Sequence, residues 1–532
     1  MFVIKWDVNK QKGMISLKKI ISVILSVAMI FCILAPASAA SGSKCNCGVN
    51  PTIYVGPLGS TDIYENPDSE NERTIFRPAT DSIIKLVVKL LPAIMLSSVT
   101  FNLDYLGDAL IEGVNEAFGA MALDGDGNSA PNVDVKLELP TDPEHGVNMS
   151  YYFSYDWRLD PVYNAGLLND YVQHVKELTG HDIVNFRASS MGGVVTLAYF
   201  NEYGYDDVDA CIFQCCPLLG TDVAGDLLNR KVALDADRLL AYATDGYPPF
   251  DAESTLLWTL FNGLYYSGLV DGVLFLGDIV LENLETRVFD ELLTPVFGTL
   301  LGLWSFVPHE SYESAKAINL DPETQAGLIK KADYYHYNIQ QRADEILKNA
   351  QKNGVRVMIV AGYNIQRTPL VEAMENNSDA TVDTKYASAG ATVAPLDGTL
   401  GENYVQCNTK CGHNHVSPDN VIDASTCILP EHTWFIKDML HSNCHDGIME
   451  MYNWFAYADE YYDVWSNPAY TQFLQNDKPN LRVIAMGNFA EGDKAPEYEE
   501  GTAFYNKFEK YVAPVTNGIF SFLDKCRDVI GL

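Results

Sequence analysis

The sequence predicts an α/β fold in which a mostly parallel central sheet is covered by helices and carries a helical cap. Short apolar runs typical of buried strands alternate with segments of helical periodicity along the chain. The segment HDIVNFRASSMGGVVTLAYF (residues 181–200) has the pattern of a buried strand, a tight turn and a helix. Two segments, at about 61–148 and 222–350, interrupt this alternation; each contains an apolar stretch, and both are predicted to be insertions.

The N-terminus has the pattern of a secretory signal peptide. Lys18 and Lys19 precede an apolar run, and small residues follow at Ala37, Ala39 and Ala40. We expect cleavage after Ala39 or Ala40 and a secreted mature protein. The alternative is an uncleaved anchor helix, but the apolar run is short for a bilayer span.

The remaining boundaries follow from the strand–helix alternation. The prediction divides the chain into a signal peptide (1–39), a first core part (40–221, with the insertion at about 61–148), a mainly helical cap or lid (222–350), a second core part (351–460) and a C-terminal extension (461–532). The net charge of −34 argues against nucleic acid as a partner and against electrostatic binding to anionic lipid. Transient contact with a lipid interface through the apolar cap stays open.

The core elements are bounded by turn residues. Strands are expected within 50–60, 149–161, Ile183–Phe186, 210–221, 354–364 and 433–439. Helices are expected over Asn164–Gly180, from Gly192 onward and over 447–458.

The turn inside 181–200 is a candidate nucleophile elbow. A serine needs an exposed position, a nearby base and backbone N–H donors for the oxyanion before it can attack an ester. Ala188-Ser189-Ser190-Met191-Gly192 fits the small-x-Ser-x-Gly pattern, with alanine in place of the first glycine. Taking Ser189 as the nucleophile would put Arg187 and Met191 where small residues belong. The remaining alternative is an ordinary serine in a βα turn.

Several segments together resemble the lecithin:cholesterol acyltransferase and lysosomal phospholipase branch of the α/β-hydrolases. They are YVGPLGS, FSYDWRLDP with the helix after it, the elbow, CCPLLGT and WSFVP, about a third of the chain. The resemblance implies an α/β-hydrolase fold and a Ser, Asp, His triad in that chain order. It aligns Asp379 with the catalytic acid, although Ser378 and Ala380 replace the family's glycines, and Asp383 is the second candidate.

The resemblance also implies the other site residues. The histidine should follow the strand at 433–439, which selects His441 over His445, while His432 precedes that strand. The oxyanion would be bound by the backbone N–H groups of Met191 and Leu58.

Two neighbouring residues are read from the same resemblance. Trp157 is expected to contact substrate beside the pocket. For Arg158, a structural pair with Asp156 or Asp160 is at least as good an interpretation.

The predicted function is a secreted serine hydrolase that cleaves lipid-like carboxylic esters through an acyl-enzyme, as lipases, esterases and phospholipases do, without a cofactor or catalytic metal. The alternatives are an acyltransferase with the same triad, a hydrolase of a non-lipid ester, and a catalytically degenerate binding protein. Outside this site, the segment CNTKCGHNH (407–415) contains cysteines and histidines, which are residues that can bind zinc. We expect a disulfide between Cys407 and Cys411 and solvated histidines there, with a zinc site as the alternative.

Overall fold

The computed structural model describes residues 47–76, 104–143, 150–233, 286–369, 371–442 and 444–486, together with residues 45, 235 and 238. The chain divides into two compact units, Met1–Asn46 and Cys47–Leu532, and the following description concerns the second. The predicted signal peptide, the apolar stretches at 81–101 and 255–280, and residues 487–532 of the C-terminal extension lie outside the described residues. Among the described helices, none has the length and hydropathy required to cross a bilayer.

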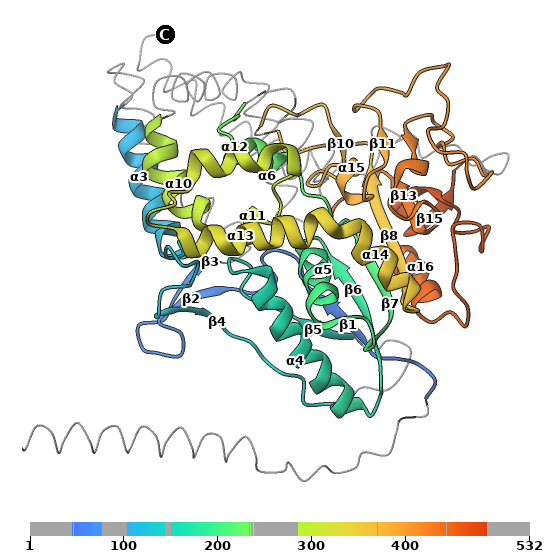
Figure 1. Cartoon of the computed structure of the whole chain (residues 1–532), viewed down its shortest axis with the longest axis horizontal. Helices are drawn as coiled ribbons and strands as arrows, with labels where there is room; N and C mark the ends of the chain where they lie inside the picture. The colour runs from blue at the N-terminus through green and yellow to red at the C-terminus, as the bar shows by residue number, and fades with distance from the viewer. Residues whose placement is uncertain are drawn as a thin grey trace, which may run out of the picture. The chain divides into compact units, whose positions relative to one another are not determined.

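Eight strands form the main sheet, in the order β15-β14-β13-β8-β7-β6-β1-β5 (Figure 1). Their bounds are β1 (Thr52–Val55), β5 (Ser150–Phe153), β6 (Val184–Ser189), β7 (Val208–Gln214), β8 (Arg356–Tyr363), β13 (Thr433–Lys437), β14 (Phe473–Asp477) and β15 (Arg482–Ala485). Neighbouring strands are parallel except β14 and β15, which are antiparallel. The predicted, mostly parallel sheet is confirmed. The two last strands were not predicted, and they extend the sheet past residue 460.

Both faces of the central strands are buried, as expected for parallel strands covered by helices. In β8, Val357 and Ile359 belong to one hydrophobic cluster, whereas Met358 and Val360 belong to a second one. The first cluster also includes residues of α4 (Pro161–Thr179), α5 (Met191–Tyr203) and α14 (Ala343–Lys352), and the second includes residues of α16 (Asp446–Ala456). Helices therefore cover the sheet on both sides.

Helix α4 shows how local sequence fixes one of these elements. The carboxylate of Asp160 accepts a hydrogen bond from the N–H of Val162 (2.9 Å), and Pro161 occupies the first helical position. At the other end Gly180 adopts a left-handed conformation (φ 69°) and its N–H donates to the carbonyl of Lys176. The predicted helix at this position is confirmed.

The described part of the first insertion adds a small sheet and a helix. Strands β2 (Ile63–Glu65), β3 (Arg73–Phe76) and β4 (Val133–Val135) pair antiparallel in the order β3-β2-β4, and α3 covers Asp104–Phe118. These strands have three or four residues each, too few for a visible alternation pattern in the sequence.

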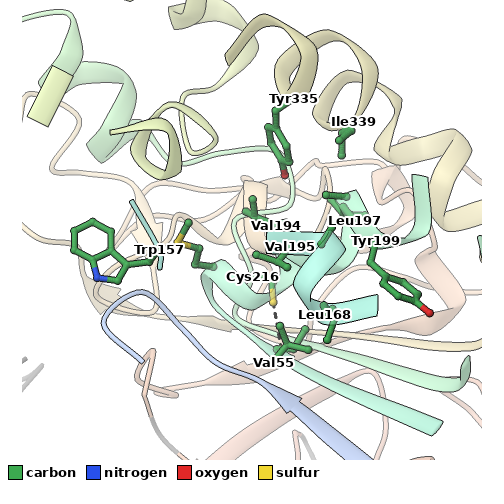
Figure 2. Close-up of a cluster of buried hydrophobic side chains, with 14 of the residues drawn as sticks. Val55, Trp157, Leu168, Val194, Val195, Leu197, Tyr199, Cys216, Tyr335 and Ile339 are labelled. Carbon is green, nitrogen blue, oxygen red and sulfur yellow. Dashed lines mark hydrogen bonds between the residues drawn. The ribbon is translucent and has the colours of Figure 1, made fainter. Parts of the chain in front are cut away.

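The described part of the predicted cap is helical and shares the core of the sheet. Its elements include α6 (Asp222–Leu228), α11 (Leu301–Trp304), α12 (His309–Asn319) and α13 (Ala326–Asn338). Tyr335 of α13 and Ile339 lie in the same cluster as Val194 and Leu197 of α5 (Figure 2). Because this cluster is continuous, the described cap helices are anchored on the core.

His336 of α13 makes the stability of this helical layer sensitive to acid. Its ring stacks on Tyr312 with a centroid distance of 3.7 Å, and burial, together with the neighbouring His309, lowers the pKa of His336 to about 4. An unfolded histidine titrates near 6.5, so the unfolded state binds more protons between these values. The free energy of unfolding is therefore not reduced by this group above about pH 6.5, and it decreases as the pH falls from 6.5 toward 4.

We expect this group to remove about 2 kcal/mol from the free energy of unfolding between pH 7 and pH 5. Urea titrations of the wild type and of His336→Phe, which keeps a ring against Tyr312 but cannot be protonated, would measure it. The variant should lose less stability than the wild type over that interval. Equal losses would contradict the assignment of this acid sensitivity to His336.

Candidate active site

The candidate nucleophile occupies a strained turn between β6 and α5. Ser190 has φ 51° and ψ −122°, a positive φ that few non-glycine residues adopt. Its N–H donates to the carbonyl of Gln214 in β7 (3.0 Å), and its own carbonyl accepts from the N–H of Gly193 (3.0 Å). The neighbouring strand and the first turn of α5 thus hold Ser190 at the end of β6.

Small residues around this turn are required by close packing. A Cβ on Gly192 would collide with the carbonyl of Val55, and one on Gly193 would collide with the side chain of Cys216. Ala188 is fully buried between Val55 of β1 and Phe213 of β7. Its methyl group fits where the common form of the motif has glycine.

Two substitutions of Ala188 test this packing. We expect Ala188→Gly to keep the folding yield and the activity toward a short ester. Ala188→Val should lower one or both, because overpacking of a filled core typically costs about 1–3 kcal/mol. Soluble yield, thermal unfolding and ester hydrolysis of the two variants would be compared. Wild-type behaviour of the valine variant would contradict this geometry.

The predicted histidine and acid lie next to Ser190. His441 Nε2 is 2.8 Å from Ser190 Oγ, and His441 Nδ1 is 2.9 Å from Asp379 Oδ2. Asp379 is fully buried, and its other oxygen accepts from the backbone N–H groups of Thr381 (3.0 Å) and Val382 (2.7 Å). Because the Asp379 carboxylate can only accept, His441 Nδ1 carries the proton. Nε2 is therefore free of a proton and can accept the one from the Ser190 hydroxyl.

The acid loop has Ser378 and Ala380 where the resemblance would place glycines. Ala380 takes the positive φ (84°) that a glycine would adopt more easily. Ser378 Oγ donates to the carbonyl of Ile365 (2.9 Å) and accepts from the N–H of Ala380 (3.0 Å), which holds this turn. A third glycine, Gly362 in β8, was not predicted: a Cβ there would lie 2.8 Å from Asp379 Cβ. It lets the acid approach the sheet.

The second acid candidate has a different environment. Asp383 forms a fully buried ion pair with Arg367 (3.0 Å) and accepts hydrogen bonds from the Thr221 hydroxyl (2.9 Å) and the N–H of Asp222 (2.8 Å). It ties the acid loop to the start of α6, and its carboxylate is not the one bonded to His441.

The two other histidines considered also have partners elsewhere. His445 Nε2 lies 2.8 Å from Asn476 Oδ1, and His432 stacks on Tyr461 before β13. Among the described residues, neither histidine contacts Ser190; the histidine that does is His441.

One of the two predicted oxyanion residues follows the nucleophile directly, and the other lines the same cavity. Met191 is the first residue of α5, where backbone N–H groups have no partner within the helix. Leu58 lines the same cavity as Ser190. Its loop is held by Tyr155, whose buried hydroxyl donates to the carbonyl of Gly56 (2.8 Å), and burial raises the pKa of this tyrosine well above its usual range.

Ser190 and His441 open into an apolar cavity of about 490 Å³. Its aliphatic and aromatic wall comes from the Leu58 loop, from α6 and from the region of α11; these residues are Leu58, Val223, Ala224, Leu227, Leu228, Leu303 and Phe306. Near the nucleophile, the lining also includes Arg187, which was not predicted and whose guanidinium lies 4.3 Å from the ring centre of Tyr54. The volume is that of a small-molecule site.

The prediction for Trp157 is not supported by its position. Trp157 is 3% exposed, packs edge-on against Phe76 at 5.1 Å, and does not line the cavity. Trp157 was expected to face the substrate, but its side chain belongs to the buried hydrophobic cluster (Figure 2). Arg158 is fully buried and bonds to both carboxylate oxygens of Asp156 (3.0 and 2.6 Å), which matches its structural interpretation.

The sheet order, the strained serine between a strand and a helix, and the chain order Ser190, Asp379, His441 define an α/β-hydrolase fold. No protein family model matches the chain, and no curated protein matches it.

Similar solved structures include a Tle4–Tli4 complex, at 12% identity over 64% of this chain and 89% of the other (TM-score 0.25). Another is a mutant of the meta-cleavage product hydrolase CumD, at 14% identity over 41% of this chain and 57% of the other (TM-score 0.14). These likenesses are too low to bear on function.

Proposed function

We propose that this protein is a serine hydrolase that cleaves carboxylic esters with a lipid-like acyl chain. The observation that carries the proposal is the continuous hydrogen-bonded row of Ser190, His441 and Asp379 at the edge of an apolar cavity. A buried carboxylate, an oriented imidazole and a hydroxyl in this geometry are the requirements for nucleophilic acyl transfer.

In the proposed reaction, Ser190 Oγ attacks the ester carbonyl while His441 Nε2 takes its proton. The resulting imidazolium is stabilised by Asp379, and the carbonyl oxygen becomes an oxyanion bound by the N–H groups of Met191 and Leu58. Collapse of this intermediate breaks the C–O bond, and His441 gives its proton to the leaving alcohol. Water, activated by His441, then releases the carboxylic acid and restores Ser190.

The cavity supports an apolar acyl group as the recognised part of the substrate. Much of its wall is built from leucine, valine, alanine and phenylalanine side chains. Burying an alkyl chain against such side chains contributes about 0.8 kcal/mol for each CH₂ group removed from water. A short or charged acid would gain little there.

Hydrolysis of a p-nitrophenyl ester series from acetate to long acyl chains tests this proposal. We expect kcat/KM to rise with chain length until the cavity is filled. Val223→Trp, which places a large ring at the cavity wall, should lower the rate for long esters more than for acetate, and Val223→Ala is the matched control. A rate that does not depend on chain length in any of the three proteins would favour a hydrolase of non-lipid esters.

The same site chemistry serves acyltransferases, which differ in the acceptor that reaches the acyl-enzyme. The resemblance to the lecithin:cholesterol acyltransferase branch keeps this alternative, and product analysis with an added alcohol would distinguish ester exchange from hydrolysis. If a fluorophosphonate probe fails to label the folded protein at any pH from mildly acidic to basic, the site is inactive. In that case a secreted binding protein becomes the better proposal.

Export of the protein is also a proposal, supported by the sequence pattern of residues 1–39. N-terminal sequencing of the protein recovered from the medium of an expressing cell should begin at Ala40 or Ser41. Recovery of the uncleaved chain with the membrane fraction would contradict this.

A further inference from the structure

A long loop, called the excursion below, precedes the strand β13, which leads to His441. It connects β11 (Thr392–Val393) to β12 (Ile422–Asp423), and apart from turns and one isolated bridge it has no regular structure. Loops of this length are uncommon in compact domains unless something fixes them or they have a function. The excursion contains the CNTKCGHNH segment.

Three side chains that can bind a metal lie close together where this excursion packs next to the start of β13. One ligating atom from each of Cys411, His413 and Glu431 lies within 4.8 Å of the other two. His415 is not part of this group of three, but its Nε2 lies 3.2 Å from Cys411 Sγ, which makes it the candidate fourth ligand. Glu431 belongs to the short helical turn Pro430–His432, immediately before β13, and the sequence pattern alone did not associate it with the other three.

The hydrogen bonds of His415 determine which of its ring nitrogens carries the proton. The residue is fully buried, contrary to the expectation of a solvated histidine, and its Nδ1 is 2.7 Å from Gln472 Oε1. The amide nitrogen of Gln472 donates to the carbonyls of Pro430 (2.6 Å) and Thr433 (3.1 Å), so its oxygen is the group that faces His415. Nδ1 therefore carries the proton, and the lone pair of Nε2 points toward Cys411.

This arrangement resembles the outer shell of metal-binding histidines, which donate their second ring N–H to an oxygen acceptor. Ligands of one zinc ion, at bond lengths of about 2.0–2.3 Å, lie roughly 3–4 Å apart, close to the spacing of Cys411 Sγ and His415 Nε2. A thiolate with imidazoles suits zinc, whereas calcium and magnesium prefer an all-oxygen set.

We propose that Cys411, His413, His415 and Glu431 bind one Zn²⁺ ion. Four protein ligands leave no open position, so the site is structural and is separate from the ester-cleaving site. Binding displaces the thiol proton of Cys411 and joins the excursion to the residue that precedes β13. The ion would thus fix the strand from which the His441 loop continues.

Cys407 provides a matched control in the same loop. Its Sγ lies 3.2 Å from the Tyr404 hydroxyl, and it is not a member of the ligand group. Cys407 and Cys411 do not form a disulfide in this structure. The expected disulfide between Cys407 and Cys411 would remove the Cys411 thiolate, so the two arrangements exclude each other.

The experiment uses the purified mature chain without an affinity tag, dialysed and analysed for metal by mass spectrometry. We expect one zinc ion per chain in the wild type and in Cys407→Ser, and a large loss of zinc in Cys411→Ser and in Glu431→Gln. His413→Ala removes an exposed side chain that has no place in the core, and it should also lose zinc. The Ser190 site should still react with a fluorophosphonate probe in every variant that folds.

A cobalt-substituted sample identifies the thiolate directly. The wild type and Cys407→Ser should show a thiolate-to-cobalt charge-transfer absorption band, and Cys411→Ser should lack it. Absence of stoichiometric zinc from the wild type, equal zinc content in all variants, or a Cys407–Cys411 disulfide found by peptide mapping of the exported protein would overturn the proposal.

Discussion

Replacing Ser190 by alanine is expected to lower ester hydrolysis by at least about 10⁴-fold without unfolding the protein. The substitution removes the only atom that forms the acyl-enzyme, and it leaves a methyl side chain in a turn that the Gln214 carbonyl and the first turn of α5 still hold. Hydrolysis of the preferred p-nitrophenyl ester, fluorophosphonate labelling and thermal unfolding would be measured on the same preparation.

The neighbouring serine is the matched control for this experiment. Ser189 also lines the cavity, is also nearly buried, and bonds to the side chain of Tyr54. The Ser189→Ala variant should still be labelled by the fluorophosphonate and should keep most of the wild-type ester hydrolysis. If instead Ser189→Ala is inactive and Ser190→Ala is active, the nucleophile has been placed one residue too far along the chain.

The parts of the fold and site that follow from local patterns were predicted from the sequence. The strand, turn and helix around Ser190 are encoded within about ten consecutive residues, since the small neighbours are needed at fixed offsets from the serine. Asp379 and His441 were assigned through the resemblance, which places the acid after the strand β8 and the histidine after the strand β13. The structure brings these three side chains together.

Features that depend on contacts between distant segments were not predictable in this way. The strand β14 contains the buried polar residues Asn476 and Asp477, so its sequence lacks the continuous apolar run of an internal strand. Trp157 was assigned to substrate contact from a resemblance, yet its side chain enters the interior. Arg158 forms the structural pair with Asp156 that was one of its two interpretations. The resembling motif acts here through Tyr155, which holds the Leu58 loop, and through the Asp156–Arg158 pair.

The two buried carboxylates of the acid loop, Asp379 and Asp383, should respond differently when each is replaced by asparagine. In Asp379→Asn the N–H groups of Thr381 and Val382 keep the amide oxygen on their side, so the NH2 group faces His441 Nδ1 and donates to it. The proton then sits on Nε2, which is the wrong tautomer for accepting the Ser190 proton. We expect kcat to fall about 10⁴-fold while the fold is retained, since the shape of the side chain is unchanged.

Asp383→Asn should instead lower stability. It leaves the fully buried guanidinium of Arg367 without its counter-charge, and breaking a buried pair by removing one partner typically costs about 3–5 kcal/mol. Activity divided by the concentration of folded protein, which thermal unfolding of the same preparation measures, separates the two effects. It should be close to wild type for Asp383→Asn and very low for Asp379→Asn. The reverse pattern would mean that Asp383 is the catalytic acid and that the Asp379–His441 contact is structural, because only the acid that orients His441 can change the turnover of sites that are already folded.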